Sequence, residues 1–345
     1  MKFVGLDIGK SQIFVCILNA QGKVVNEFKV RNDGAALFDR LRGLSKPIAV
    51  CYEASCGYGH LYDRLTRIAR RILVAHPGHL RLIFKSKRKN DRVDAKKLAT
   101  LLFLDQVPTI HVPSPDVRAW RSLIEFRSRL VAKRTRVKNG IRAVCRTHGL
   151  AVPSGKRLWS QRGRQHLAEM TFPHPAAALE RDLLLSELEH ADQRIKRVEH
   201  ELNELARRHP GVALLQTIPG IGPRTAEAFV AYVDQPQRFA RVKQVGAYFG
   251  LVPCQDQSGS VNRLGHITRE GPATMRRLLT EAAWRGVRNS PRIRERYERF
   301  MCGDPQRRKI ALVAVAHYLV RVMYAMLRRG EAWNEAGGPP AASAA

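Results

Sequence analysis

The nine residues from Lys2 to Lys10 constrain the fold of this chain more than any other stretch. Phe3 to Ile8 has the length and apolar content of a short buried strand, and it carries one carboxylate, Asp7, near its end. A buried strand rarely contains an aspartate without a use for it, because an unpaired buried charge is costly. Gly9 then allows the chain to turn tightly. We therefore expect Asp7 to belong to a functional site.

The segments after Asp7 alternate between strand and helix patterns as far as about residue 110. Apolar runs and turn residues predict strands over 12–18 and 23–30, a helix over 35–42, a strand over 47–53, a helix over 58–70 and a strand over 72–75. A three-stranded meander with an acid on its first strand is how the ribonuclease-H-like fold opens. We predict an α/β ribonuclease-H-like domain over residues 1–110. Metal-dependent nucleases and recombinases share this opening with actin-like sugar kinases.

Three further carboxylates fall where the predicted fold would bring them to Asp7. Glu53 ends an apolar strand, and in open α/β sheets functional sites gather at the carboxyl ends of strands. Asp91 and Asp94 stand three residues apart at the start of a predicted helix, so their side chains share one face. Alone, Asp91 would equally suit a helix cap. As a set, the four carboxylates repel one another unless divalent metal neutralises them, and we predict that this acidic tetrad binds a pair of Mg²⁺ ions.

The balance of charge indicates a nucleic-acid partner. Lys and Arg number 60 against 30 Asp and Glu, a formal net charge of +30, which favours a polyanion such as DNA or RNA. Residues 113–170 carry 14 Lys or Arg, including Arg134 and Lys138, against three acids. We predict that these residues contact phosphates together with a second basic group. That group lies around Asp91 and Asp94 and consists of Lys85, Lys87, Arg88, Lys89, Arg92, Lys96 and Lys97.

Composition also argues against several classes of protein. We find no run of about 18 apolar residues, and therefore expect no transmembrane helix and no membrane partner. The first residues read as a strand rather than a signal peptide. The six cysteines are scattered, which fits reduced thiols in a cytoplasm better than a zinc site. We expect a cytoplasmic protein of a bacterium or archaeon.

Residues 111–210 are predicted to be helical, and their second half carries a heptad pattern. The apolar positions are Leu184, Leu188, Ala191, Ile195, Val198, Leu202 and Leu205. This seam of about three repeats would pack as a helical hairpin within the chain or would pair two protomers as a coiled coil. Residues 218–222 then resemble the turn of a helix-hairpin-helix motif. Backbone N–H groups near Gly220 and Gly222 would bind a DNA phosphate there.

The last third of the chain is predicted to be a mainly α domain over residues 211–330. Composition makes 253–271, which contains Ser258, a loop rich in glycine and serine. Helices rich in arginine follow, and we count Arg276 and Arg277 among the candidate nucleic-acid contacts. A final helix is expected over 308–329. The tail 331–345 is predicted to be disordered.

Together these segments resemble one family, the DEDD transposases of insertion sequences, which are recombinases guided by a bridge RNA. The resemblance covers nearly the whole chain. Its carriers are residues 5–8, 52–54, 90–95, 218–222 and 250–253, the last followed by Ser258 and Gly259. Each motif alone is weak, whereas all of them in this order are specific.

The resemblance implies a RuvC-like domain with the acidic tetrad, a coiled-coil dimerisation region and a C-terminal transposase domain. It implies that Ser258 attacks a DNA phosphorus and forms a covalent phosphoserine link, assisted by metal at the tetrad of another protomer. It also implies donor and target DNA, a guide (bridge) RNA, and a homo-oligomer, either a dimer or a dimer of dimers on DNA. A serine ester would conserve phosphodiester energy while strands are exchanged, without ATP.

Three other readings stay open at this point. A metal-only, RuvC-like DNA nuclease would use the tetrad without Ser258. An actin-like kinase should carry further glycine-rich phosphate and adenosine loops, which we do not find, and a charge of +30 is unusual for it. A non-catalytic nucleic-acid scaffold would leave the four placed acids unexplained.

Overall fold

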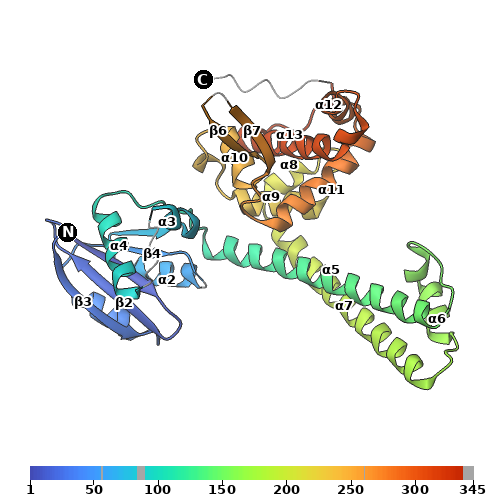
Figure 1. Cartoon of the computed structure of the whole chain (residues 1–345), viewed down its shortest axis with the longest axis horizontal. Coiled ribbons are helices and arrows are strands. Elements are labelled where there is room, and N and C mark those ends of the chain that lie inside the picture. The colour runs from blue at the N-terminus through green and yellow to red at the C-terminus, as the bar shows by residue number, and fades with distance from the viewer. Residues whose placement is uncertain (56, 84–89, 260, 337–345) are drawn as a thin grey trace. The chain divides into compact units, whose positions relative to one another are not determined.

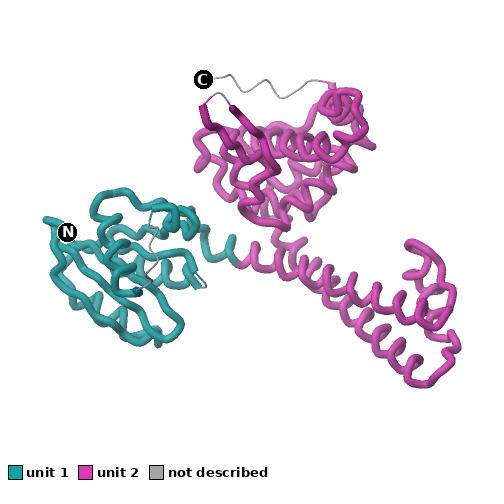
Figure 2. Tube along the Cα trace, viewed as in Figure 1, with its two compact units in different colours: residues 1–118 teal, residues 119–345 magenta. Residues whose placement is uncertain are grey.

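The computed structural model describes residues 1–55, 57–83, 90–259 and 261–336. The chain divides into two compact units, unit 1 over residues 1–118 and unit 2 over residues 119–345 (Figure 2). This division differs from the four predicted segments because the helix after residue 110 continues without a break from one unit into the other. We describe each unit by itself.

Unit 1 is built on a mixed five-stranded sheet with the order β3-β2-β1-β4-β5 (Figure 1). The strands are β1 (Lys2–Ile8), β2 (Gln12–Leu18), β3 (Val24–Arg31), β4 (Ile48–Glu53) and β5 (Arg71–Ala75). The first three pair antiparallel, which confirms the predicted meander, while β4 and β5 run parallel to β1. This topology is compatible with a ribonuclease-H-like fold.

The two faces of this sheet are covered by different helices. Side chains of α1 (Ala36–Arg42) and α2 (Tyr58–Leu65) share one apolar core with Val4 and Leu6 of β1. Helix α4 (Asp91–Phe103) packs on the opposite face, where its apolar residues meet those of β1, β2 and β4. The short helix α3 (Pro77–Ile83) follows β5 and was not predicted. Helix α2 is also shorter than expected and ends at Leu65.

Unit 2 begins with a long helical hairpin. Helix α5 (Pro115–Thr147) and helix α7 (Pro175–Arg207) lie side by side, joined through a short 3₁₀ turn (Arg157–Trp159) and α6 (Gln161–Glu169) (Figure 1). The heptad positions of α7 face α5 and the adjoining apolar cores; Leu188, Ala191, Ile195 and Leu202 are buried. The seam therefore packs within the chain, one of the two arrangements expected from the sequence.

The rest of unit 2 is mainly helical. It contains α8 (Pro210–Leu215), α9 (Pro223–Val233), α10 (Val242–Tyr248), α11 (Ala273–Asn289), α12 (Pro291–Met301) and α13 (Arg308–Arg329), with 3₁₀ turns at Pro236–Arg238 and Pro305–Arg307. The prediction of a loop over 253–271 is wrong, because most of this segment forms a hairpin of β6 (Pro253–Ser258) and β7 (Val261–Ile267). Its described residues are nearly all exposed, so no alternation of apolar and polar residues marks these strands.

Helix α13 is the centre of this domain. The stretch Pro305–Arg329 contains an 18-residue window with a mean hydropathy of 1.9, enough for a membrane span and missed in the sequence. Of that window 56% is buried, and α13 contacts α8, α10, α11 and α12. We therefore assign it as a core helix, the reading that fits a helix enclosed by its neighbours.

The chain after α13 differs in part from the expected disordered tail. The Trp333 backbone N–H donates to Thr217 Oγ1 at 3.0 Å, and the Arg292 guanidinium lies 4.8 Å from the Trp333 ring centre. Glu335 accepts hydrogen bonds from Ser290 Oγ at 2.6 Å and Trp333 Nε1 at 2.7 Å. Trp333 and Glu335 are thus held by hydrogen bonds, although most of residues 331–336 are exposed, and 337–345 lie outside the described residues.

Candidate active site

The first two acids of the predicted tetrad end neighbouring parallel strands. Leu6 of β1 pairs with Tyr52 of β4, and Asp7 and Glu53 are the next residues on each strand. Adjacent strands lie about 4.8 Å apart, so these two positions are neighbours at one edge of the sheet. Both side chains are half-buried. The register therefore brings the two predicted carboxylates together.

The pleat turns both of these positions toward helix α4. Successive residues of a strand point to opposite faces, so Asp7 shares the face of Phe3 and Gly5. The Phe3 ring meets Phe103, at the end of α4, with ring centres 5.3 Å apart. Gly5 lies against the middle of the helix, where a Cβ would come within 2.1 Å of the Ala95 carbonyl oxygen. From Phe3 to Asp7 the strand thus runs toward the start of α4.

The start of α4 carries the other two acids. Asn90 caps the helix by accepting a hydrogen bond from the Arg92 backbone N–H at 3.1 Å. Asp91 and Asp94 occupy the first turn. Asp94 Oδ1 accepts from Lys97 Nζ at 2.8 Å, which places an ammonium beside the carboxylate. Strand register and helix packing therefore direct all four acids to one end of unit 1, which we call the acidic edge.

The acidic edge fits a divalent metal in its chemistry. Carboxylate oxygens are the preferred protein ligands of Mg²⁺. Within the described ranges, no group of three or more His, Cys, Asp or Glu side chains is spaced to hold a metal ion. The chemical type of these side chains fits the metal, their spacing does not, and Lys97 supplies the positive charge at Asp94.

Sequence analysis did not single out His76, which follows β5 at this same edge. Ala75 pairs with Glu53, and His76 is the next residue. Its ring stacks on that of His79 with ring centres 4.4 Å apart. The rule that sites gather at carboxyl ends of strands would have identified this position.

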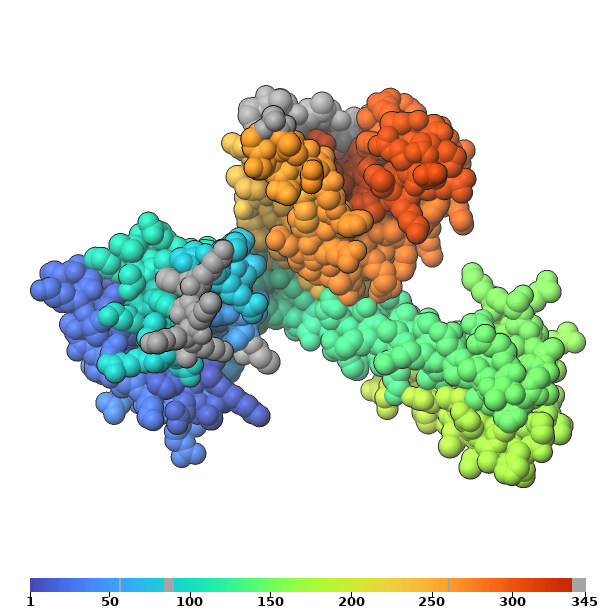
Figure 3. All heavy atoms as spheres, in the orientation of Figure 1, coloured from blue at the N-terminus to red at the C-terminus, as the bar shows by residue number. Residues whose placement is uncertain are grey.

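Ser258 lies in a different setting. It ends β6 and pairs with Val261 of β7, beside Gly259, whose φ is +57°. The hairpin is exposed along both strands, and it stands at the surface of unit 2 (Figure 3). Among the described residues, no hydrogen bond to the Ser258 hydroxyl is found.

The predicted phosphate contacts between residues 85 and 138 fall into three groups. Lys85, Lys87, Arg88 and Lys89 lie outside the described residues. Arg92 donates to Glu27 through Nε at 2.8 Å and Nη2. Arg134 and Lys138 lie on α5, where Arg134 Nη1 is 3.2 Å from Asp192 Oδ1 and Lys138 Nζ is 4.9 Å from the Trp159 ring centre.

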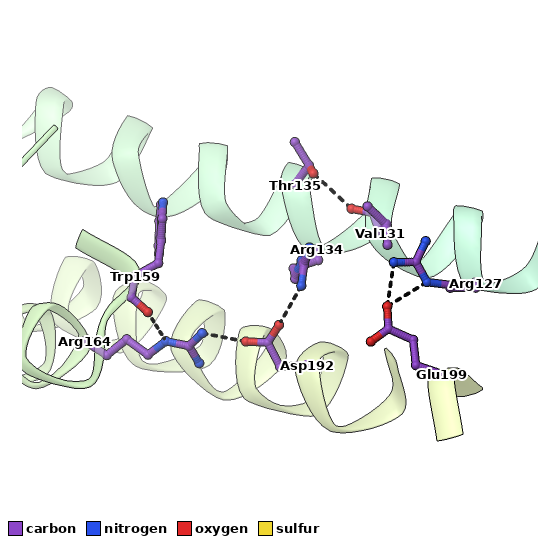
Figure 4. A network of polar contacts seen from close by, with 8 residues as sticks. All are labelled: Arg127, Val131, Arg134, Thr135, Trp159, Arg164, Asp192 and Glu199. Atoms are coloured by element: carbon purple, nitrogen blue, oxygen red, sulfur yellow. Dashed lines mark hydrogen bonds and ion pairs between the residues drawn. The ribbon is translucent and has the colours of Figure 1, made fainter. Parts of the chain in front are cut away.

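Several cations of the α5–α7 helical hairpin, among them Arg127, Arg134 and Arg164, are paired with acids of α7 (Figure 4). Arg127 donates a hydrogen bond to Glu199, and the Asp192 carboxylate accepts hydrogen bonds from both Arg134 and Arg164. Burial alone would raise the pKa of Asp192, but hydrogen bonds from Arg164 and Arg134 hold that pKa below its usual range. The cationic run of α5 therefore serves the hairpin itself, at least at these positions.

The remaining predicted contacts also take part in packing. Gly220 has a φ of +96°, and a Cβ there would come within 2.5 Å of the Gly286 backbone nitrogen, so it seats α11. Gly222 is the N-cap of α9 and is open, with nothing within 4 Å of its Cβ position. Arg276 donates to the Gly271 carbonyl at 3.1 Å, and Arg277 donates to Ser128 Oγ at 3.1 Å.

Two family models match the chain. Residues 4–148, which include the acidic edge, match the DEDD model of IS110 elements, described as "Transposase". Residues 212–298, which include Ser258, match the model described as "Transposase IS116/IS110/IS902 family". The two matches follow the order of the two units.

Curated relatives align along nearly the whole chain. The transposase for insertion sequence element IS1111A of Coxiella burnetii is 28% identical over 97% of this chain and 92% of its own length. A probable family 20 transposase of Pseudomonas aeruginosa is 29% identical over 94% and 96%. The transposase for insertion sequence element IS1328 of Yersinia enterocolitica is 25% identical over 97% and 99%. With both models matched in order, the chain belongs to the IS110/IS116/IS902 family of transposases, enzymes that act on DNA.

Proposed function

We propose that this transposase cuts and rejoins DNA at the acidic edge and at Ser258, through a covalent serine–DNA intermediate. What supports the proposal is that the ends of β1 and β4, which carry Asp7 and Glu53, and the first turn of α4, which carries Asp91 and Asp94, lie toward the same end of unit 1. Carboxylates that come close to one another repel unless a divalent cation binds between them. A bound pair of Mg²⁺ ions would stabilise the attacking and leaving oxygens of a phosphodiester displacement.

In the proposed step the Ser258 hydroxyl is the nucleophile. The Oγ–P bond forms as the bond from phosphorus to one bridging oxygen of the DNA breaks, and the serine proton passes to a base while the leaving oxygen gains one. A phosphate ester is exchanged for a phosphate ester, so the reverse attack by a new strand end needs no ATP. Exposure of the β6–β7 hairpin supports this role, because a DNA strand can reach Ser258 directly.

Guidance by a bridge RNA belongs to the same proposal, as do donor and target DNA and a homo-oligomer, a dimer or a dimer of dimers. A net charge of +30 supports contact with more than one nucleic acid. If base pairing between the bridge RNA and the DNA selects the sequence, the protein itself needs only contacts to phosphates, which is the type of contact predicted for its basic residues. As the family resemblance implies, we propose that Ser258 and the acidic edge of one site come from different protomers.

A denaturing gel tests the serine step. Purified protein with its co-expressed flanking RNA is mixed with labelled donor and target DNA and Mg²⁺, beside Ser258→Ala and, as a matched control, Ser260→Ala. We expect a protein–DNA adduct that only Ser258→Ala abolishes. Cleavage without an adduct, unchanged in Ser258→Ala, would instead support a metal-only DNA nuclease, which uses the acidic edge alone.

A further inference from the structure

Unit 1 has a basic pocket on the face of the sheet that α1 and α2 cover, whereas Asp7 and Glu53 of the acidic edge point to the face that α4 covers. The pocket encloses about 440 Å³, within the roughly 300–1,000 Å³ of ligand pockets. It is lined by Phe38, Arg42, Lys46, Arg64, Arg67 and Ile68.

The cations of this pocket are held in place by the surrounding structure. The Arg64 guanidinium lies 3.7 Å from the ring centre of Phe38, which is buried. Lys46 Nζ donates to the Leu41 carbonyl at 3.2 Å. Stacking and hydrogen bonding of this kind reduce the freedom of long side chains, so a ligand would meet a partly ordered site.

Charge in the pocket is not balanced. Four cations line it, and within the described part of the chain the one carboxylate ion-paired to any of them is Asp39, at 3.1 Å from Arg42. Burial lowers the pKa of Lys46, because removal from water disfavours its charged form. An anion entering the pocket would offset this cost by pairing with the ammonium.

The α5–α7 helical hairpin of unit 2 shows how arginines that stabilise the fold are paired in this protein. Arg127, Arg134 and Arg164 each meet a carboxylate of α7. Arg64 and Arg67 have no such partner among the residues that the structure describes. Their charges therefore contribute no ion pair to the fold and remain available to a ligand.

We propose that the α1–α2 pocket binds a phosphodiester of a nucleic acid and anchors that strand away from the site of cutting. A phosphate suits two guanidiniums and an ammonium, which donate several charge-assisted hydrogen bonds. The Phe38 ring is buried and covered by Arg64, so the pocket takes a phosphate rather than a stacked base. Its ligand is not the scissile phosphate, because the acidic edge lies on the other face.

This inference requires only that the chain acts on nucleic acid, as its family does, and it is independent of the serine step. Binding is measured in EDTA, where no metal-assisted cutting occurs. The probes are a fluorescent DNA duplex and a fluorescent RNA, both of random sequence. The variant is Arg64→Gln/Arg67→Gln, and the matched control is Lys23→Gln/Lys29→Gln, which removes the same charge from exposed positions of the same unit.

We expect the pocket variant to bind more weakly, with a log–log salt slope smaller by about 2, since each phosphate contact contributes close to one. The probe that loses affinity identifies the strand as DNA or RNA. An unchanged slope on both probes, or an equal loss in the control, would overturn the proposal. Arg67→Glu alone, at an exposed side chain of the pocket, repeats the test without disturbing the Arg64–Phe38 stack.

Discussion

The acidic edge and the β6–β7 hairpin carry the two halves of the proposed chemistry, and the fold treats them in opposite ways. Asp7 and Glu53 extend strands whose preceding residues, Leu6 and Tyr52, are fully buried. Helix α4 packs so closely on β1 that only a glycine fits at position 5. Ser258 ends β6, which pairs only with β7 in a two-stranded hairpin. Nearly all described side chains of these two strands are exposed.

The difference teaches that the two sites are positioned by different means. A side chain at the end of a core strand is held by the packing of the whole sheet, so its geometry is set before substrate arrives. An isolated two-stranded hairpin is only marginally stable in water. We therefore expect the acidic edge to be preorganised and the Ser258 hairpin to become ordered by DNA.

The largest expected effect comes from the acidic edge. Asp7→Asn keeps the shape of the side chain but removes its charge, and strand cleavage should fall about 10³-fold or more, as expected when several kcal/mol of metal assistance are lost. Binding of DNA and RNA should persist, and both are measured on the same preparation. Cleavage that survives in EDTA would contradict the metal role.

The packing of α4 on β1 gives the next largest effect. In Gly5→Ala the new Cβ would lie 2.1 Å from the Ala95 carbonyl oxygen and 2.4 Å from the Ala99 nitrogen, both backbone atoms that cannot turn aside. We expect unit 1 to lose about 3 kcal/mol or more of unfolding free energy, and cleavage to fall with it.

The matched control for Gly5→Ala is Gly222→Ala in unit 2, whose Cβ would meet nothing within 4 Å. Thermal unfolding followed by circular dichroism compares the two variants. If Gly5→Ala unfolded at the wild-type temperature, the close approach of α4 would not be what holds Asp7 in place.

Unit 2 buries the carboxyl group of Glu227, and this burial disfavours its ionised form. Burial raises the pKa of Glu227 to about 8, although Arg224 at 3.2 Å favours the ionised form. The folded protein then binds this proton more tightly than the unfolded chain, whose carboxyl has an ordinary pKa near 4.5. By linkage, stability falls as pH rises from about 4.5 to about 8.

Glu227→Gln should remove that fall. The amide resembles the protonated acid, so we expect the variant to exceed wild type by about 2 kcal/mol above pH 8 and to match it near pH 5. Urea unfolding across this pH range checks it, with the exposed Glu201→Gln as control. A variant that is less stable at every pH would mean that the Arg224 pair keeps Glu227 ionised.

The parts of the fold that follow hydrophobic pattern were predictable from the sequence. The meander, the strand ending at Glu53 and the helix beginning at Asp91 each show the period of their structure, and their ends locate the candidate acids. The heptad of α7 predicted its buried face but not its partner, since Arg134 and Asp192 are 58 residues apart and only the fold brings them together.

What the sequence could not supply depends on exposure and on pairing. Strands β6 and β7 were missed because nearly all of their side chains face water. Arg134 was predicted to contact phosphate, and its carboxylate partner Asp192 is visible only in three dimensions. The basic pocket escaped notice for the opposite reason, since Arg42, Lys46, Arg64 and Arg67 are scattered in sequence and gathered by α1 and α2.

The smallest expected effect concerns the hairpin arginines. Asp192→Asn removes the carboxylate that Arg134 and Arg164 share, at 3.2 and 2.5 Å. These groups are partly exposed, so solvent screening limits the loss of unfolding free energy to about 1 kcal/mol. Because the hydrogen bonds lower the pKa of Asp192, this contribution is present at neutral pH and is lost on acidification.

The same variant sharpens the contrast between paired and free cations. The sequence predicted that Arg134 contacts nucleic acid. If the α5–α7 helical hairpin is such a surface, releasing Arg134 and Arg164 from Asp192 should tighten binding of DNA or RNA and steepen the salt dependence of that binding. Glu189→Gln removes the same charge from an exposed position of α7 that has no partner among the described residues. Tighter binding in Asp192→Asn alone would mean that the ion pairs hold these arginines away from phosphates. An equal gain in both variants would reflect net charge only, and the predicted role of Arg134 would fail.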